Sequence, residues 1–173
     1  MSGYKTHFTT AAGCALVIIA ISHRHTPFLA WFSLVNAWCI VASMLGGLFP
    51  DIDIKSKGQQ LLYAIIIPLL IATLLAKKVV LSILLSALGI IPPLLPHRGI
   101  THHVWFSFLA PLIGPGLVYI YCPEHVELAY DLYFFFVIGA LSHLILDYGP
   151  ATLLRRMLRP LANYLRSRKK RKK

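Results

Sequence analysis

The sequence has few charged residues and few cysteines, and each shortage argues against a class of protein. Only 13% of the 173 residues are charged, whereas 57% are hydrophobic. This balance is too apolar for a soluble domain and is typical of a polytopic membrane protein. The three cysteines lie far apart in the chain, which argues against a disulfide framework and against a thiolate metal site. The sequence has no internal repeat and no linker before its basic tail, so we expect one compact helical domain.

Long apolar runs predict an all-α fold, a polytopic membrane helix bundle. A spanning helix needs about 20 mainly apolar residues, and six segments approach that length: 8–22, 27–49, 60–76, 79–95, 104–122 and 128–147. Only Lys77 and Lys78 separate the third segment from the fourth. Residues 60–95 therefore form either a spanning hairpin, which makes six crossings, or one long bent helix, which leaves four.

The distribution of basic residues predicts the orientation. With six crossings, most Lys and Arg residues fall on the side that holds both termini, and the positive-inside rule makes that side cytoplasmic. We assign residues 1–150 to the transmembrane domain and 151–173 to an amphipathic, basic cytoplasmic tail, interrupted at Pro160. Because a basic tail beside a membrane helix favours anionic lipid, we expect membrane lipids as partners and no nucleic acid; the oligomeric state stays open.

Polar residues gather at the same cytoplasmic helix ends. An ionised Asp within a membrane costs roughly 2.5–3.5 kcal/mol, so such groups need a common partner, and a divalent metal ion supplies one. A lone histidine at the membrane interface is usually solvated or hydrogen-bonded in the core, so we leave His103 out of the site. Seven residues are the candidate metal ligands: His7, Asp51, Asp53, His97, His102, His143 and Asp147.

Local spacing supports convergence of these side chains. His143 and Asp147 are four residues apart and share one face of a helix. Pro50 predicts an extended or turned segment, in which Asp51 and Asp53 project to the same side.

Cap signals place the other candidates. Ser56 followed by Gln59 predicts a capping box at the start of the third apolar helix. Thr101, after the turn permitted by Gly99, is the expected N-cap of the fifth helix, which puts His102 in its first turn.

The ligand types indicate which metal is expected. Imidazoles with carboxylates suit Zn²⁺, and Mn²⁺ or Fe²⁺ are possible. Seven candidate ligands exceed the needs of one four-coordinate ion. Two ions, or one ion with a full set of supporting residues, are both compatible with the sequence.

Four motifs resemble those of a known family. "THF", "LFPDIDIKSKGQ", "HRGITHH" and "LSHLILDYGPATLL" resemble, in the same order, the motifs of the YdjM-like, LexA-regulated family of membrane-bound metal-dependent hydrolases. The resemblance covers residues 6 to 154 and implies a multi-pass protein of the bacterial inner (plasma) membrane, in which the seven candidate ligands form the metal site. It also implies a distant similarity to zinc-dependent phospholipase C and single-strand nucleases.

These observations predict a membrane-embedded hydrolase. In this hypothesis a metal-activated water attacks a phosphoester, possibly lipid-linked, at the cytoplasmic face. Three residues are the expected catalytic groups: Asp53 as the base, with Arg98 and His102 beside the bound anion. The alternative is a non-catalytic membrane protein with a structural metal site and a basic tail that binds lipid or a partner. A metal or proton transporter is less favoured, because the polar residues gather at one face.

Overall fold

The computed structural model describes residues 3–23, 33–53, 55–94 and 100–155. Within these ranges the chain is helical and contains no strand, so the expectation of an all-α bundle is confirmed. The predictions for His97, Arg98 and Pro160 concern positions outside the described residues.

Seven α-helices occur in the described ranges: α1 (Tyr4–Ser22), α2 (Leu34–Leu48), α3 (Lys57–Leu75), α4 (Val79–Ile90), α5 (Val104–Leu109), α6 (Ile113–Tyr121) and α7 (Val126–Tyr148). Short 3-10 helices connect several of them: η2 (Phe49–Asp53), η3 (Pro92–Leu94), η4 (Ile100–His102) and η5 (Pro123–His125). After Gly149, at φ 73°, residues 150–155 are again helical.

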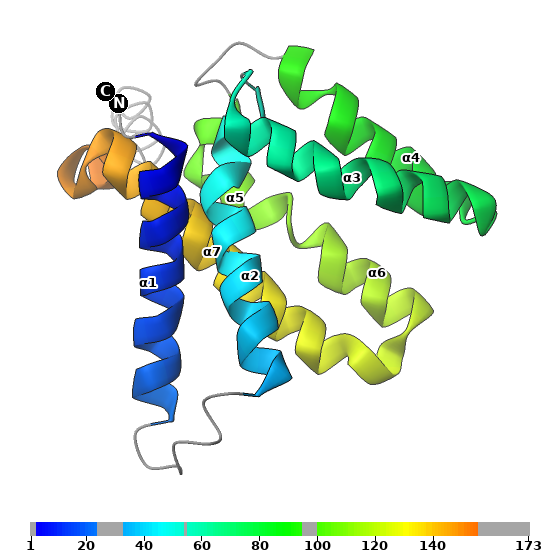
Figure 1. Ribbon diagram of the computed structural model, residues 1–173, viewed down its shortest axis with the longest axis horizontal. Coiled ribbons are helices and arrows are strands. Elements are labelled where there is room, and N and C mark those ends of the chain that lie inside the picture. The colour runs from blue at the N-terminus through cyan, green and yellow to red at the C-terminus, as the bar shows by residue number, and fades with distance from the viewer. Residues whose placement is uncertain (1–2, 24–32, 54, 95–99, 156–173) are drawn as a thin grey trace, which may run out of the picture.

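Helices α1, α2 and α7 pack against one another and form the centre of the molecule. Figure 1 shows α1 and α2 side by side, with α7 running diagonally behind them. The α3–α4 pair points away from this centre, and α6 returns along α7. The helices thus spread outward from the end of the bundle at which α1 begins and α2 ends.

Small residues allow the central helices to approach closely. A Cβ added to Gly139 of α7 would overlap the backbone of Ser43 in α2, and one added to Gly46 would overlap the backbone of Phe136. Ala11 of α1 is fully buried, and its carbonyl oxygen accepts a 2.8 Å hydrogen bond from Ser43 Oγ. Close approach through small residues is how helices associate in a membrane, where the hydrophobic effect does not drive them together.

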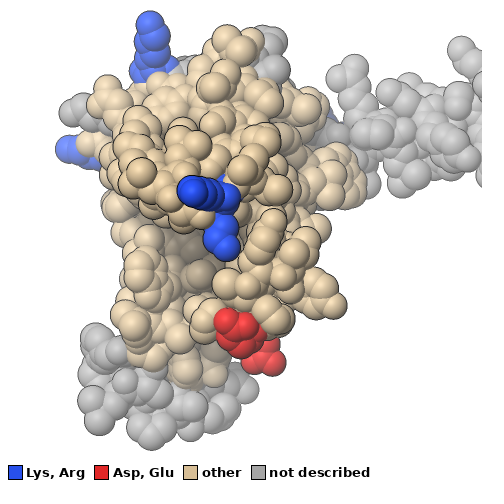
Figure 2. Space-filling model, turned by 90° about the vertical axis from the view of Figure 1, so that its right-hand side faces the viewer, with Lys and Arg blue, Asp and Glu red and all other residues tan. Residues whose placement is uncertain are grey.

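In the part of the chain that the structure describes, five helical segments are long and apolar enough to cross a membrane: Tyr4–Ser22, Leu34–Asp53, Gly58–Leu75, Val104–Tyr121 and Pro123–Tyr148. The segment Val79–Leu94 is apolar but shorter. Figure 2 shows a face of the molecule on which charged side chains are sparse. Such a surface suits contact with lipid, and together these features make the protein a polytopic membrane helix bundle.

The alternative of one bent helix across 60–95 is wrong. The chain turns at Ala76–Lys78, and α4 runs back along α3. Tyr63, near the start of α3, donates a 2.6 Å hydrogen bond to the carbonyl oxygen of Gly89, near the end of α4. The two helices are therefore an antiparallel hairpin, in which the second helix is the shorter.

Candidate metal centre

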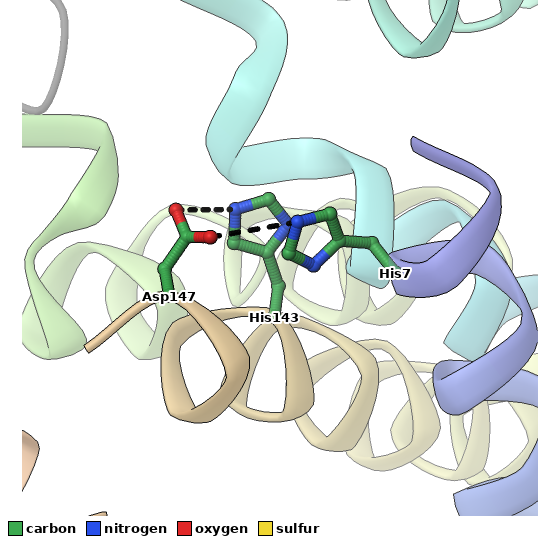
Figure 3. A group of neighbouring side chains, drawn as sticks. All are labelled: His7, His143 and Asp147. Carbon is green, nitrogen blue, oxygen red and sulfur yellow. Dashed lines mark ion pairs between the residues drawn. The ribbon is translucent and has the colours of Figure 1, made fainter. Parts of the chain in front are cut away.

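The candidate ligands come from four helix ends that meet at one end of the bundle. His7 lies in the first turns of α1, Asp51 in η2, His102 in η4, and His143 and Asp147 in the last turns of α7. Two groups of ligand atoms lie close enough to hold an ion: His7 with His143 and Asp147, and Asp51 with His102 and His143. Figure 3 shows Asp147 reaching toward both His7 and His143.

Four ligand atoms from these groups are linked by short nitrogen–oxygen distances. His102 Nε2 lies 3.6 Å from Asp51 Oδ1 and 3.8 Å from Asp147 Oδ2. His143 Nε2 lies 3.5 Å from the same oxygen of Asp51 and 3.6 Å from the same oxygen of Asp147. A tetrahedral ion with bonds of about 2.0–2.2 Å separates its ligand atoms by about 3.3–3.6 Å. The four nitrogen–oxygen distances are therefore close to those around a tetrahedral ion, and the ligand atoms of Asp51, His102 and His143 all lie within 4.8 Å of one another.

A backbone carbonyl determines the protonation of His143. Its Nδ1 lies 2.8 Å from the carbonyl oxygen of Gly47, and because that oxygen can only accept, Nδ1 carries the proton and donates it. In the neutral ring, Nε2 then carries a lone pair, which points toward the carboxylates of Asp51 and Asp147. Nε2 is fully buried and has no hydrogen-bond partner among the described residues. This is the orientation of a metal ligand.

Gly47 can supply that carbonyl because it has no side chain. A Cβ on Gly47 would approach Ala11 Cβ to 2.8 Å and the His7 carbonyl oxygen to 3.1 Å. The close packing of α1 on α2 at this level thus brings His7 and the Gly47 backbone to His143.

The closeness of the imidazole rings limits how many of them can be protonated at once. The rings of His7 and His143 are stacked with centroids 3.7 Å apart, and those of His102 and His143 lie 5.5 Å apart. Three buried imidazolium ions at these separations would repel one another. One divalent ion would neutralise both carboxylates and could accept both Nε2 lone pairs.

His7 stacks on His143 and also contacts Asp147. Its Nε2 is 3.5 Å from Asp147 Oδ1, the oxygen that does not face His102 and His143. The side chain of Asp147 is 5% exposed and His7 is 1% exposed. Asp147 can therefore link His7 to the other three residues, Asp51, His102 and His143.

Asp53 lies apart from both groups and contacts a different partner. Its Oδ2 accepts a 3.1 Å hydrogen bond from the hydroxyl of Thr101. The expectation that Asp51 and Asp53 project to the same side is wrong because the segment is a 3-10 helix, not an extended strand. A 3-10 helix has three residues per turn, so residues two apart point in different directions.

Two expected caps also differ in detail. Ser56 does cap α3, since its Oγ accepts from the Gln59 amide, but the Gln59 side chain donates to the Ile52 carbonyl instead of completing a capping box. Thr101 lies inside η4 and does not cap α5, whose N-cap residue is His103.

Sequence reasoning missed the supporting roles of Gly47 and Thr101. A glycine pair at the end of an apolar helix, "GG" at 46–47, signals close helix packing, but no local pattern tells which carbonyl a distant histidine will meet. Thr101 had been explained as a cap, and only its neighbours in space show the contact with Asp53.

Comparison with known proteins gave one match. A family model described as YdjM inner membrane protein matches residues 1–168. No curated protein and no solved structure matches the chain.

Proposed function

The chain belongs to the YdjM inner membrane protein family, and from this premise we propose that it is a membrane-embedded, metal-dependent hydrolase. The observation that carries the proposal is the set of four buried or half-buried ligand atoms, each 3.5–3.8 Å from two of the others, contributed by Asp51, His102, His143 and Asp147. Zinc is the first choice of ion, with manganese or iron as further options.

The ion would supply an activated water molecule and polarise the bond that is attacked. The protein holds the ligands in place through the close packing of α1, α2 and α7. Water and substrate reach the ligands most easily beside Asp51, whose side chain is 18% exposed, whereas that of Asp147 is 5% exposed. We therefore place the reacting bond on the Asp51 side of the site.

The proposed substrate is a phosphoester, most simply one linked to a lipid. The site lies at the end of an apolar helix bundle, and in a membrane we expect headgroup phosphates at that level. Lys55 is exposed and follows Asp51 by four residues, so it adds positive charge to the segment that carries the accessible ligand. We also propose that both termini and the site face the cytoplasm, as the distribution of basic residues predicts, and that the basic tail binds anionic lipid.

Metal content tests the first part of the proposal. Protein purified in detergent should contain one divalent ion per chain, measured by elemental analysis, and His143→Ala should abolish it. His103→Ala is the matched control, because His103 is exposed and adjacent in sequence to the buried His102. A native protein that contains no ion and binds none on addition would refute the proposal.

Turnover tests the second part. Zinc-loaded protein should release product from vesicles of mixed anionic and zwitterionic phospholipids, or from a soluble phosphodiester, as measured by mass spectrometry. Asp51→Asn should lose this activity, and His103→Ala should retain it. The two substrate arms decide whether the phosphoester must be part of a lipid.

A structural metal site is the second candidate, and one observation favours it. Catalytic zinc sites usually keep one position free of protein ligands, whereas structural sites use four, and Asp51, His102, His143 and Asp147 together offer four ligand atoms. Full metal occupancy without turnover of either substrate class would favour this function over hydrolysis.

A further inference from the structure

We propose that Asp53 and Thr101 form a positioning pair that determines which nitrogen of His102 faces the metal ion. The inference rests on the metal site proposed above and adds two residues that do not touch the ion. It also gives Asp53 a part other than the ligand and base expected from the sequence.

The hydrogen bonds run in one direction from His102 to Asp53. The Thr101 hydroxyl donates to Asp53 Oδ2 over 3.1 Å, because a carboxylate oxygen can only accept. With its single proton engaged, Thr101 Oγ1 can only accept from His102 Nδ1, which lies 3.2 Å away. His102 Nδ1 therefore carries the proton, and Nε2 presents its lone pair to Asp51 and Asp147.

The three residues that form these hydrogen bonds are buried, so water does not reach them. Thr101 is 0% exposed, His102 is 3% exposed and Asp53 is 8% exposed. A charged carboxylate at this depth strengthens the bonds it accepts, since water does not compete for them.

Local structure explains why Asp51 and Asp53 have separate parts. The 3-10 turn of η2 directs Asp51 to the metal ligands and Asp53 to η4, against which η2 packs. The Gln59 side chain donates to the Ile52 carbonyl over 2.8 Å, and Ile52 itself is fully buried. The two carboxylates on either side of Ile52 are thus held in different directions.

The pair should matter for metal affinity because it selects the ring tautomer. Without an acceptor at Nδ1, the neutral ring can carry its proton on Nε2, and binding an ion then requires that proton to move. Residues that accept the second ring proton of a metal ligand typically contribute 10- to 100-fold in affinity.

Two substitutions of Thr101 distinguish this role from a role in packing alone. Thr101→Val keeps the shape and removes the hydroxyl, whereas Thr101→Ser keeps the hydroxyl and removes a methyl group. In the full-length protein in detergent, we expect Thr101→Val to weaken Co²⁺ binding about 10- to 100-fold and to alter the visible absorption spectrum of the bound Co²⁺. We expect Thr101→Ser to restore both to near the wild-type values. Asp53→Asn, which can still accept from Thr101 but lacks the charge, should give an intermediate loss.

The outcomes distinguish this inference from the proposed function. Wild-type Co²⁺ affinity and spectrum in Thr101→Val would overturn the positioning pair and leave the metal site intact. Equal losses in Thr101→Val and Thr101→Ser would also overturn it, because packing would then explain both. A wild-type protein that binds no Co²⁺ and no Zn²⁺ would overturn the proposed function and, with it, this inference.

Discussion

Among the described residues other than glycine, only Lys77 has a positive φ, at 54°. It follows the last turn of α3, where its amide donates to the Leu74 carbonyl and the Lys78 amide donates to the Thr73 carbonyl. These two hydrogen bonds form a Schellman motif, which ends a helix with one left-handed residue, usually glycine. The side chain of Lys77 therefore adds strain to the turn of the α3–α4 hairpin.

Replacing this lysine tests that strain. Lys77→Gly should raise the free energy of unfolding by about 1 kcal/mol, because glycine adopts the left-handed conformation without a steric penalty. Lys78→Gly is the control: its φ is −85°, so it should give no gain. Chemical denaturation in detergent followed by circular dichroism measures both. Equal stability of Lys77→Gly and the wild type would show that the turn relaxes in the membrane protein.

At the scale of helices, the contact between α2 and α7 positions the site. Both carry glycine where the other helix's backbone lies closest, at Gly46 and Gly139. The same contact places the Gly47 carbonyl against His143. Packing density and ligand orientation therefore depend on the same pair of helices.

A methyl group at this contact should separate the helices. Gly139→Ala should lower the free energy of unfolding by about 1–3 kcal/mol, the usual cost of overpacking, because the new Cβ would overlap the Ser43 backbone. It should also weaken Zn²⁺ binding, because the Gly47 carbonyl would move from His143. Gly116→Ala is the matched control, since a Cβ there meets nothing within 4 Å. Thermal unfolding and zinc titration measure the two effects; a Gly139→Ala protein as stable as the control would contradict this account.

At the scale of the whole molecule, the position of the site at one end of the bundle makes a prediction about sidedness. Lys55 and His103 are exposed and flank the site, whereas the exposed Cys122 follows the end of α6. If Val104–Tyr121 crosses the membrane once, Cys122 lies on the opposite side from the other two positions.

Thiol labelling with a membrane-impermeant reagent measures this arrangement. In a Cys122→Ser background, Lys55→Cys and His103→Cys should both react in inside-out vesicles and not in intact cells. The native Cys122 should react from the outside, and the buried Cys39 provides the unreactive reference. Labelling of Lys55→Cys and His103→Cys from different sides would separate Asp51 from His102 and exclude a shared site.

Much of the architecture followed from composition and periodicity. Apolar runs of spanning length predict helices because lipid leaves the backbone no other hydrogen-bond partners, and each expected segment contains described helix. The segment 104–122 is divided into α5 and α6 by a turn at residues 110–112, and α4 is shorter than expected. The spacing of four between His143 and Asp147 also sufficed to place both on one face, since a helix has 3.6 residues per turn. The assignment of the seven candidate residues as metal ligands stays a prediction.

Only the tertiary structure decided the direction of each polar side chain. No pattern in the sequence distinguishes Asp51 from Asp53. In the structure, Asp51 faces His102 and His143, whereas Asp53 accepts a hydrogen bond from Thr101. That difference depends on the 3-10 geometry of η2 and on the segments packed against it, which lie far away in the chain. The sequence by itself determined which residues are available and at which end of the bundle they lie. Their division into ligands and supporting residues depended on distant helices, because the hydrogen-bond acceptor for a buried imidazole is whichever group packing brings within 3 Å or so.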